Sequence, residues 1–133
     1  MADLSQASLV LADLRGARLG GACLCEADLR EAKLGNATLT AANLRGADFR
    51  GADLSGANLS GAYLCDAKFA GAKLKMVELA DANITGAHFE GTDLAEVPLE
   101  GISLIAACGD AKTRLPRGVT RPAHWPPETP DRF

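Results

Sequence analysis

A five-residue period runs through the first three quarters of this 133-residue chain. Every fifth residue from Leu4 to Leu104 is large and apolar, which gives 21 such positions without an interruption. The residue two places earlier is small, and it is Ala in 17 of the 21 repeats. The residue two places later is Gly in 10 repeats, from Gly16 to Gly101. A repeat this regular decides the architecture before the preferences of single residues are considered.

A period of five excludes both one continuous helix and one continuous strand. In an α-helix, five residues advance the large side chain by about 140°, so these side chains would scatter around the cylinder. In a single strand, an odd step sends successive large residues to opposite faces. The chain must therefore turn within each repeat. Ala and Leu two residues apart point to the same side of a short extended piece, and Gly stands at the position of a type II turn that requires a positive φ.

Residues 2–104 resemble the pentapeptide-repeat family, whose pattern is Ala, then Asp or Asn, then Leu and two variable residues. Two consecutive repeats, Ala52–Gly56 and Ala57–Gly61, match that pattern residue for residue. The resemblance implies an all-β fold, a right-handed quadrilateral parallel β-helix of about five coils with four pentapeptides in each coil. We therefore expect a β-helix over residues 1–104 and an irregular C-terminal cap and Pro-rich tail over residues 105–133.

Two sets of residues spaced by 20 favour a coil of four repeats. Phe49, Phe69 and Phe89 fall into one stacked column only if a coil contains 20 residues. Outward residues of alternating charge have the same spacing, and opposite charges on neighbouring strands stabilise a sheet; they are Asp13, Lys33, Asp53, Lys73 and Asp93. The predicted structural core comprises Leu44, Phe49, Leu54, Leu59, Leu64, Phe69, Leu74 and Phe89.

The N-terminal coil is a candidate surface for a homodimer. We expect this coil to expose its apolar interior and a rim of unpaired strand groups. Outward apolar residues in the same coil, Val10 and Leu11, would enlarge the apolar area. The alternative is a monomer whose first coil frays. The candidate dimer surface consists of Leu4, Leu9, Val10, Leu11 and Leu14.

The composition changes after Leu104. The last 18 residues hold five of the six prolines, and residues 105–133 carry a net charge of +2 where the repeats carry −5. We expect residues 105–115 to form a short helix or turn over the apolar end of the last coil. Trp125 and Phe133 either clip the tail onto the rod as a cap or present a binding site for a partner.

The composition also excludes several classes of protein. With 17 acidic and 14 basic residues the net charge is −3, so a basic nucleic-acid-binding protein is not expected. No apolar run approaches the roughly 18 residues of a membrane span. The first residues lack the basic region and apolar run of a signal peptide, so a cytoplasmic protein is expected, and the resemblance suggests a bacterial one.

No motif of a known catalytic or cofactor site is present. The chain lacks a phosphate-binding loop, a dinucleotide-binding fingerprint, a zinc-protease helix and a nucleophile elbow. We therefore expect no enzyme activity, no catalytic residue and no cofactor. Cys23 and Cys25 lack two further ligands at zinc spacing, and Cys65 is too distant from Cys25 for a disulfide. Free surface thiols and surface histidines, His88 and His124, are expected, with a metal or redox role of the thiols as the alternative.

The resemblance also implies which functions to weigh. Some pentapeptide-repeat proteins resemble duplex DNA in size and charge and bind DNA gyrase or topoisomerase IV, protecting them from quinolones or peptide toxins. Such a mimic needs rows of acids that bases do not cancel. Here the outward columns are mixed, and acids concentrate only near the C-terminal coils. The candidate acidic interaction surface consists of Glu78, Glu90, Asp93, Glu96 and Glu100.

We therefore expect a non-enzymatic scaffold for protein–protein interaction with a partner that the sequence does not identify. The alternative is a DNA mimic that binds DNA gyrase. A third class is a small binding module that uses the tail around Trp125.

Overall fold

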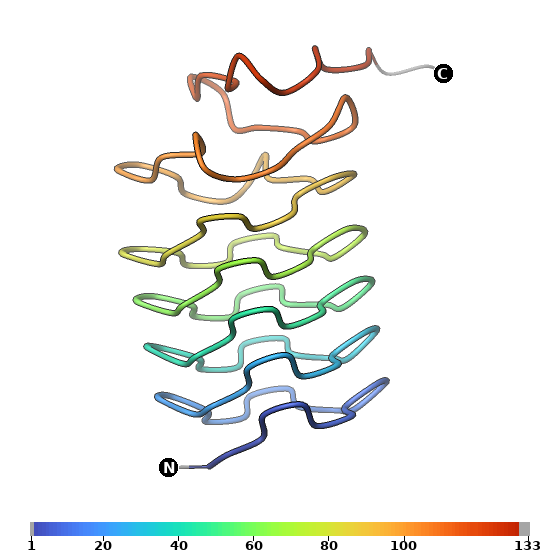
Figure 1. Cartoon of the computed structure of the whole chain (residues 1–133), viewed down its shortest axis with the longest axis vertical. Helices are drawn as coiled ribbons and strands as arrows, with labels where there is room; N and C mark the ends of the chain where they lie inside the picture. Colours follow the sequence, from blue (N-terminus) through green and yellow to red (C-terminus); the bar gives the residue numbers. More distant parts are fainter. Residues whose placement is uncertain (1, 131–133) are drawn as a thin grey trace.

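The computed structural model describes residues 2–130, so the predicted role of Phe133 falls outside the described part. Within this part the chain forms no helix, and therefore none that could cross a membrane. It winds into coils stacked along the long axis, with the N-terminal residues at one end and the C-terminal residues at the other (Figure 1). The β-structure consists of isolated parallel bridges rather than long strands, from Asp3–Cys23 to Asp93–Arg114. The predicted all-β fold is present.

The bridges follow a constant register over most of the chain. From Asp3–Cys23 to Lys73–Asp93, paired residues lie 20 apart in the sequence, which equals four pentapeptides. Each repeat contributes two hydrogen bonds to this ladder. The N–H of Leu44 donates to the C=O of Tyr63 at 2.8 Å, and the N–H of Tyr63 donates to the C=O of Ala42 at 2.9 Å. Neighbouring coils are thus joined through the backbone of every repeat.

The corner of each repeat needs a positive φ. The predicted glycines adopt it, with φ between 66° and 75° from Gly16 to Gly101. Nine other residues adopt the same conformation where Gly is absent, including Leu11 at 63° and Met76 at 61°. Asp or Asn in the second position supports the corner, because its side chain accepts a hydrogen bond from the N–H two residues later. The N–H of Ser55 donates in this way to Asp53 at 3.0 Å.

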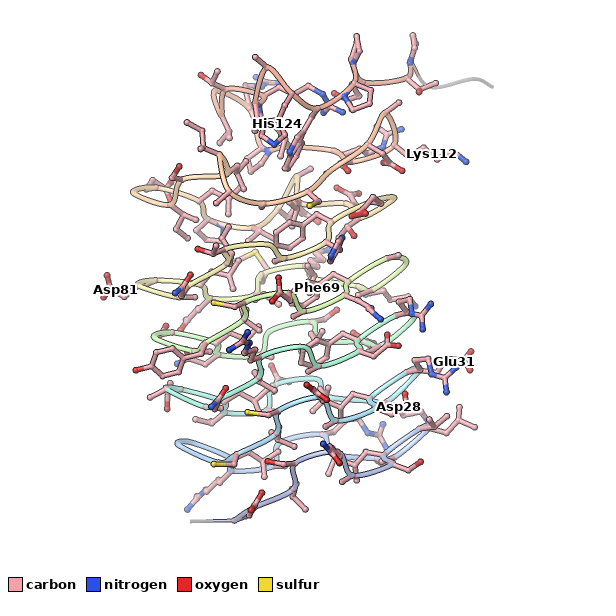
Figure 2. The ribbon with its side chains drawn as sticks, viewed as in Figure 1. Asp28, Glu31, Phe69, Asp81, Lys112 and His124 are labelled. Carbon is pink, nitrogen blue, oxygen red and sulfur yellow. The ribbon has the colours of Figure 1, made fainter. Side chains whose placement is uncertain are left out.

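The first and third residues of each repeat point inward and form the core. From Ala22 to Phe69, all of them are at most 2% exposed, and each buried Leu or Phe contributes about 1.5–3 kcal/mol before entropy is subtracted. The predicted column of phenylalanines is present, with the ring centres of Phe49 and Phe69 5.1 Å apart and those of Phe69 and Phe89 5.2 Å apart. Figure 2 shows Phe69 inside the stack.

Residues 106–114 add part of a further coil. Cys108 pairs with His88, and Arg114 pairs with Asp93. The buried hydroxyl of Thr113 donates to the C=O of Phe89 at 2.8 Å. Of the two forms expected for residues 105–115, turns are observed and no helix forms. Backbone pairing with the coil below explains this outcome, because those groups are not available for helical hydrogen bonds.

The last described residues fold back onto the end of the stack. Trp125 is 4% exposed, and its indole N–H donates to the C=O of Ala107 at 3.0 Å. Arg121 lies over the indole ring and donates to the C=O of Thr113 at 2.9 Å. A Cβ on Gly109 would overlap the indole ring. Trp125 therefore forms part of a cap on the last coil.

Candidate protein-interaction surface

The middle residue of each extended piece points outward, and residues 20 apart stack into outer columns on the wall of the rod. No column has one sign of charge throughout. The four outer columns are Asp3, Cys23, Asn43, Tyr63 and Asn83; Ser8, Asp28, Asp48, Lys68 and His88; Asp13, Lys33, Asp53, Lys73 and Asp93; and Arg18, Thr38, Asn58 and Glu78. The predicted ladder of alternating charge is the third of these columns.

Three aspartates in the N-terminal half are neutralised by an arginine two residues later. Ion pairs join Asp13 to Arg15 at 2.7 Å and Asp28 to Arg30 at 2.7 Å. Asp48 pairs with Arg50 in the same way at 2.6 Å. Each guanidinium donates through two nitrogens, which fixes the geometry of the pair.

The arginines also hold these aspartates ionised. Hydrogen bonds from the side chain of Arg15 lower the pKa of Asp13 to about 2. Those from Arg30 lower the pKa of Asp28 to about 2. The bases thereby cancel the acids locally, so this half of the wall does not present a row of unbalanced negative charge.

The C-terminal third of the rod is acidic. Residues 76–111 contain seven acids and no Lys or Arg. Five of the seven were predicted to form an interaction surface, and Glu78, Asp93, Glu96 and Glu100 are exposed. They do not form one row, because Glu78 and Asp93 stand in different outer columns and the others lie at corners. The acids surround the last coil and give this end of the molecule a negative potential.

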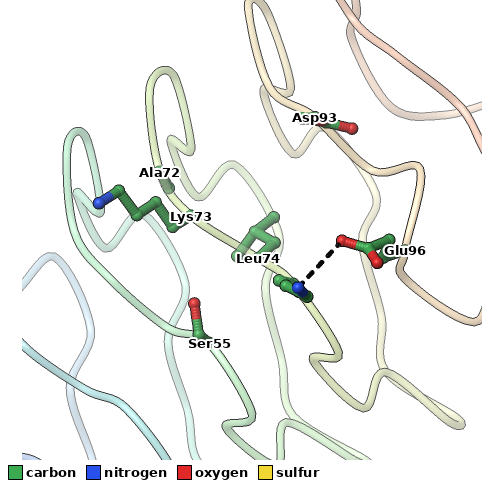
Figure 3. Close-up of a pocket in the computed structure, with 7 residues that line it drawn as sticks. Ser55, Ala72, Lys73, Leu74, Asp93 and Glu96 are labelled. Carbon is green, nitrogen blue, oxygen red and sulfur yellow. Dashed lines mark ion pairs between the residues drawn. The ribbon is translucent and has the colours of Figure 1, made fainter.

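Two of these acids have partners. Glu96 lies 3.7 Å from Lys75 and contributes to a cleft of about 310 Å³ whose lining also includes Lys73 and Asp93 (Figure 3). Glu90 contacts His88 at 3.2 Å, and its Oε1 atom is buried without a hydrogen-bond partner. The cleft has charges of both signs, so it is a mixed surface and not a row of phosphate-like acids.

The hydrogen-bond ladder opens between residues 77–85 and residues 98–105, a feature that the sequence did not predict. Within the described chain, no β-bridge and no backbone hydrogen bond joins these two segments, which we call the open seam. Pro98 was recognised as a residue without a donor. Its position in the small-residue pattern, beside Val97, was the available signal for a gap in the ladder.

The predicted dimer surface at the N-terminal coil is only partly buried. Leu4, Leu9 and Leu14 are half-buried, although their counterparts one coil later are almost fully buried. Val10 is 37% exposed and Leu11 is 68% exposed.

The cysteines and histidines do not converge. All four cysteines are free and half-buried. Within residues 2–130, no group of three His, Cys, Asp or Glu residues is placed to hold a metal ion. The exposed His124 instead contacts the C=O of Ala107 at 3.2 Å in the cap.

The stacked coils and the short parallel pairings define a solenoid repeat protein. The profile of the pentapeptide repeats matches residues 2–31, 32–69 and 62–101, with 8 copies. The chain belongs to the pentapeptide-repeat family. No curated protein matches the sequence.

Solved structures of other pentapeptide-repeat proteins resemble this chain. A protein of the Arabidopsis thaliana thylakoid lumen is 36% identical with a TM-score of 0.64, and the match covers 74% of this chain. The chain spans only 65% of the length of that protein. A protein from Nostoc Pcc 7120 is 28% identical with a TM-score of 0.54, over 89% of this chain and 77% of the other.

Proposed function

We propose that this chain is a non-enzymatic scaffold for protein–protein interaction, built as a right-handed, four-sided rod of about five coils. The outer columns carry this proposal, because their fixed 20-residue register holds mixed polar and charged side chains on the wall. Tyr63 stands on this wall and is 54% exposed. An exposed tyrosine on a rigid surface is a suitable anchor for a protein partner.

Site-specific photo-crosslinking in cells tests this proposal. A benzoylphenylalanine at Tyr63 is expected to give a discrete crosslinked product with one partner. The same group at Thr38, in another outer column, serves as the matched control. Products that are equally diffuse at both positions would count against a specific interaction through the wall.

The second candidate is a DNA mimic that binds DNA gyrase, and the acidic segment 76–111 favours it. A gyrase supercoiling assay with and without a quinolone distinguishes the two functions. A mimic should inhibit or protect gyrase in a salt-sensitive manner. The triple change Glu90→Lys, Glu96→Lys and Glu100→Lys should abolish that effect. No effect at high micromolar protein would remove this candidate.

The homodimer and the compartment belong to the same proposal. Half-buried Leu4, Leu9 and Leu14 support stacking of two copies through the N-terminal coil, in a protein that we place in the bacterial cytoplasm. Sedimentation velocity at several concentrations tests the dimer. Leu11→Lys is expected to weaken self-association, and a monomer at all concentrations would contradict it.

A further inference from the structure

The open seam interrupts an otherwise continuous ladder. One coil earlier, Leu59, Gly61 and Leu64 each donate an N–H to the next coil at 2.8 Å. Their counterparts Leu79, Asp81 and Ile84 have no backbone acceptor in the described chain. The ladder is intact on both sides of the gap. Met76 donates to Glu96 at 3.1 Å, and Gly86 donates to Ala106 at 2.7 Å.

Both edges of the seam carry free hydrogen-bonding groups. In the regular register, Ser103 would donate to the C=O of Ala82, and this bond is also missing from the described chain. The upper edge further presents the C=O groups of Pro98, Glu100 and Ser103, which accept no backbone hydrogen bond there. Unpaired N–H and C=O groups along an extended backbone are a template for an added strand.

Proline and register explain why the coils separate here. Pro98 has no N–H to donate to the C=O of Val77, and its ring occupies the place of that hydrogen. The bonds that flank the seam span 20 residues, from Met76 to Glu96 and from Gly86 to Ala106, where the regular ladder spans 19. The upper coil is therefore displaced by one residue relative to the lower one at both ends of the gap.

Two cavities follow the seam. Their volumes are about 470 Å³ and 160 Å³, and both are lined by Ala80, Glu100 and Ile102, so they are continuous. Ile84 and Ile105 add apolar surface to the larger cavity, and Ile105 is 76% exposed. The seam thus combines free backbone groups with apolar contacts.

All charged residues that line the two cavities are acids. They are Glu78, Asp81 and Glu100, and all three are exposed. None of them forms an ion pair within the described chain. The charge of the seam is therefore available to a partner of opposite sign.

We infer that the open seam binds an extended basic peptide, which adds a strand between the two coils. The inference rests on the proposed scaffold function and names one surface and one class of partner for it. Successive side chains of a strand point to opposite faces. Small apolar residues of the peptide would therefore face the interior, near Ile84 and Ile102, and Lys or Arg at alternate positions would face Glu78, Asp81 and Glu100.

An amidated eight-residue peptide of alternating Lys and Val is the probe, and backbone amide exchange measured by NMR is the readout. Without peptide, the amides of Leu79, Asp81, Ile84 and Ser103 should exchange quickly, whereas those of Leu59, Gly61 and Leu64 should be protected. Saturation with peptide should slow exchange in the first set by about tenfold or more. A peptide of alternating Lys and Pro has the same charge but cannot donate to the C=O groups of the seam, and it should not protect these amides.

Charge reversal at the seam tests the electrostatic part. The double change Glu78→Lys and Glu100→Lys should weaken binding by about tenfold at low salt. The matched control, Glu26→Lys and Glu31→Lys, makes the same change of charge in coils where the ladder is intact, and it should leave affinity for the peptide nearly unchanged. Both variants alter exposed residues, so circular dichroism should show the same fold as the unchanged chain.

Three outcomes would overturn the inference. They are protected seam amides in the free protein, no protection by the Lys–Val peptide, and equal loss of affinity in the seam variant and its control. The proposed scaffold function has a separate readout, the product crosslinked at Tyr63. If that product forms while the peptide leaves the seam amides unchanged, the scaffold remains and the seam is a water-filled gap.

Discussion

The regular coils and the open seam share the same five-residue pattern but differ in backbone pairing. Leu59 and Leu64 are fully buried and donate to the next coil, whereas Leu79 and Ile84 are 3% and 5% exposed and have no backbone acceptor in the described chain. The core therefore continues beneath the seam although the ladder does not. Inward packing and coil-to-coil hydrogen bonding are separable properties of this repeat.

The size of the small inward residue accounts for part of this difference. In the regular coils that residue is Ala, and a column of methyl groups lets the coils approach closely. In the last coil it is Thr92, Val97 or Ile102. Larger side chains in a column shaped for Ala require more space. Thr92 is accommodated because its buried hydroxyl donates to the C=O of Phe69 at 3.0 Å.

The largest expected effect is loss of the regular core. Leu64→Asp places a carboxylate at a position that is 0% exposed, and it should destabilise the fold by about 4 kcal/mol or more. We expect no cooperative thermal transition by circular dichroism. Tyr63→Asp, at the exposed neighbouring residue, is the control and should retain the transition. A soluble Leu64→Asp protein with an unchanged melting curve would show that the column is not the core.

The second effect would create a seam inside the regular coils. Asn58 stands in the outer column that Pro98 would continue, and its N–H donates to the C=O of Ala37 at 2.9 Å. Asn58→Pro removes this donor and the side-chain bond to Ser60, so we expect destabilisation by about 3 kcal/mol. Chemical denaturation measures this loss, and Asn58→Ala separates the side-chain effect from the backbone effect. Equal stability of the two variants would mean that the ladder contributes little.

The third effect concerns the cap. A Cβ at Gly109 would overlap the ring of Trp125, so Gly109→Ala should expel the indole and cost about 2 kcal/mol. Tryptophan fluorescence should shift to longer wavelength, and the chain has only one Trp. Gly35→Ala is the control, because its Cβ would meet only ordinary contacts at 3.7 Å or more. An unchanged emission maximum in Gly109→Ala would place the cap elsewhere.

Much of the fold was predictable because each inference rested on a strict period. The spacing of Phe49, Phe69 and Phe89 predicted their stacking, and the Gly positions predicted the corners. The same period fixed which residues point outward, so the column from Asp13 to Asp93 was also predictable. Side-chain direction in a regular repeat depends only on sequence position, and no long-range information is needed.

The candidate site was less predictable, because it depends on departures from the repeat. The acids of residues 76–111 were visible in the sequence, but their distribution around the last coil was not. Pro98 indicated one missing hydrogen bond, whereas the seam extends over residues 77–85. Its extent follows from the one-residue displacement that begins at Glu96, which is set by packing between coils. The role of Trp125 likewise required the contact with Gly109.

A fourth prediction sharpens the contrast by repairing the seam. Pro98→Ala restores an N–H that can donate to the C=O of Val77. The new hydrogen bond is worth about 0.5–1.5 kcal/mol, and loss of proline costs about 0.4–1 kcal/mol through the unfolded state. We therefore expect little change in melting temperature but slower amide exchange at Leu79 and Ile84. Unchanged exchange would assign the seam to the larger residues Val97 and Ile102 instead.

The smallest effect concerns charge in the regular coils, where acids have arginine partners that Glu78 and Glu100 lack. Asp28 has a pKa lowered to about 2, chiefly by hydrogen bonds from the side chain of Arg30. Its ordinary pKa is about 3.9, so the pair stabilises the fold fully above that pH and loses its effect as the pH falls towards 2. NMR titration of the Asp28 carboxyl should therefore give a midpoint near 2, and Arg30→Gln should return it towards about 3.9. Arg50→Gln is the control, because Arg50 acts on Asp28 only through its charge and should move the midpoint less. Since the pair is exposed to solvent, both changes should leave the melting temperature nearly the same at neutral pH. A midpoint unaffected by Arg30→Gln would mean that the acids of the regular coils are not neutralised locally, and the charge difference between the two regions would then be smaller than the ion pairs indicate.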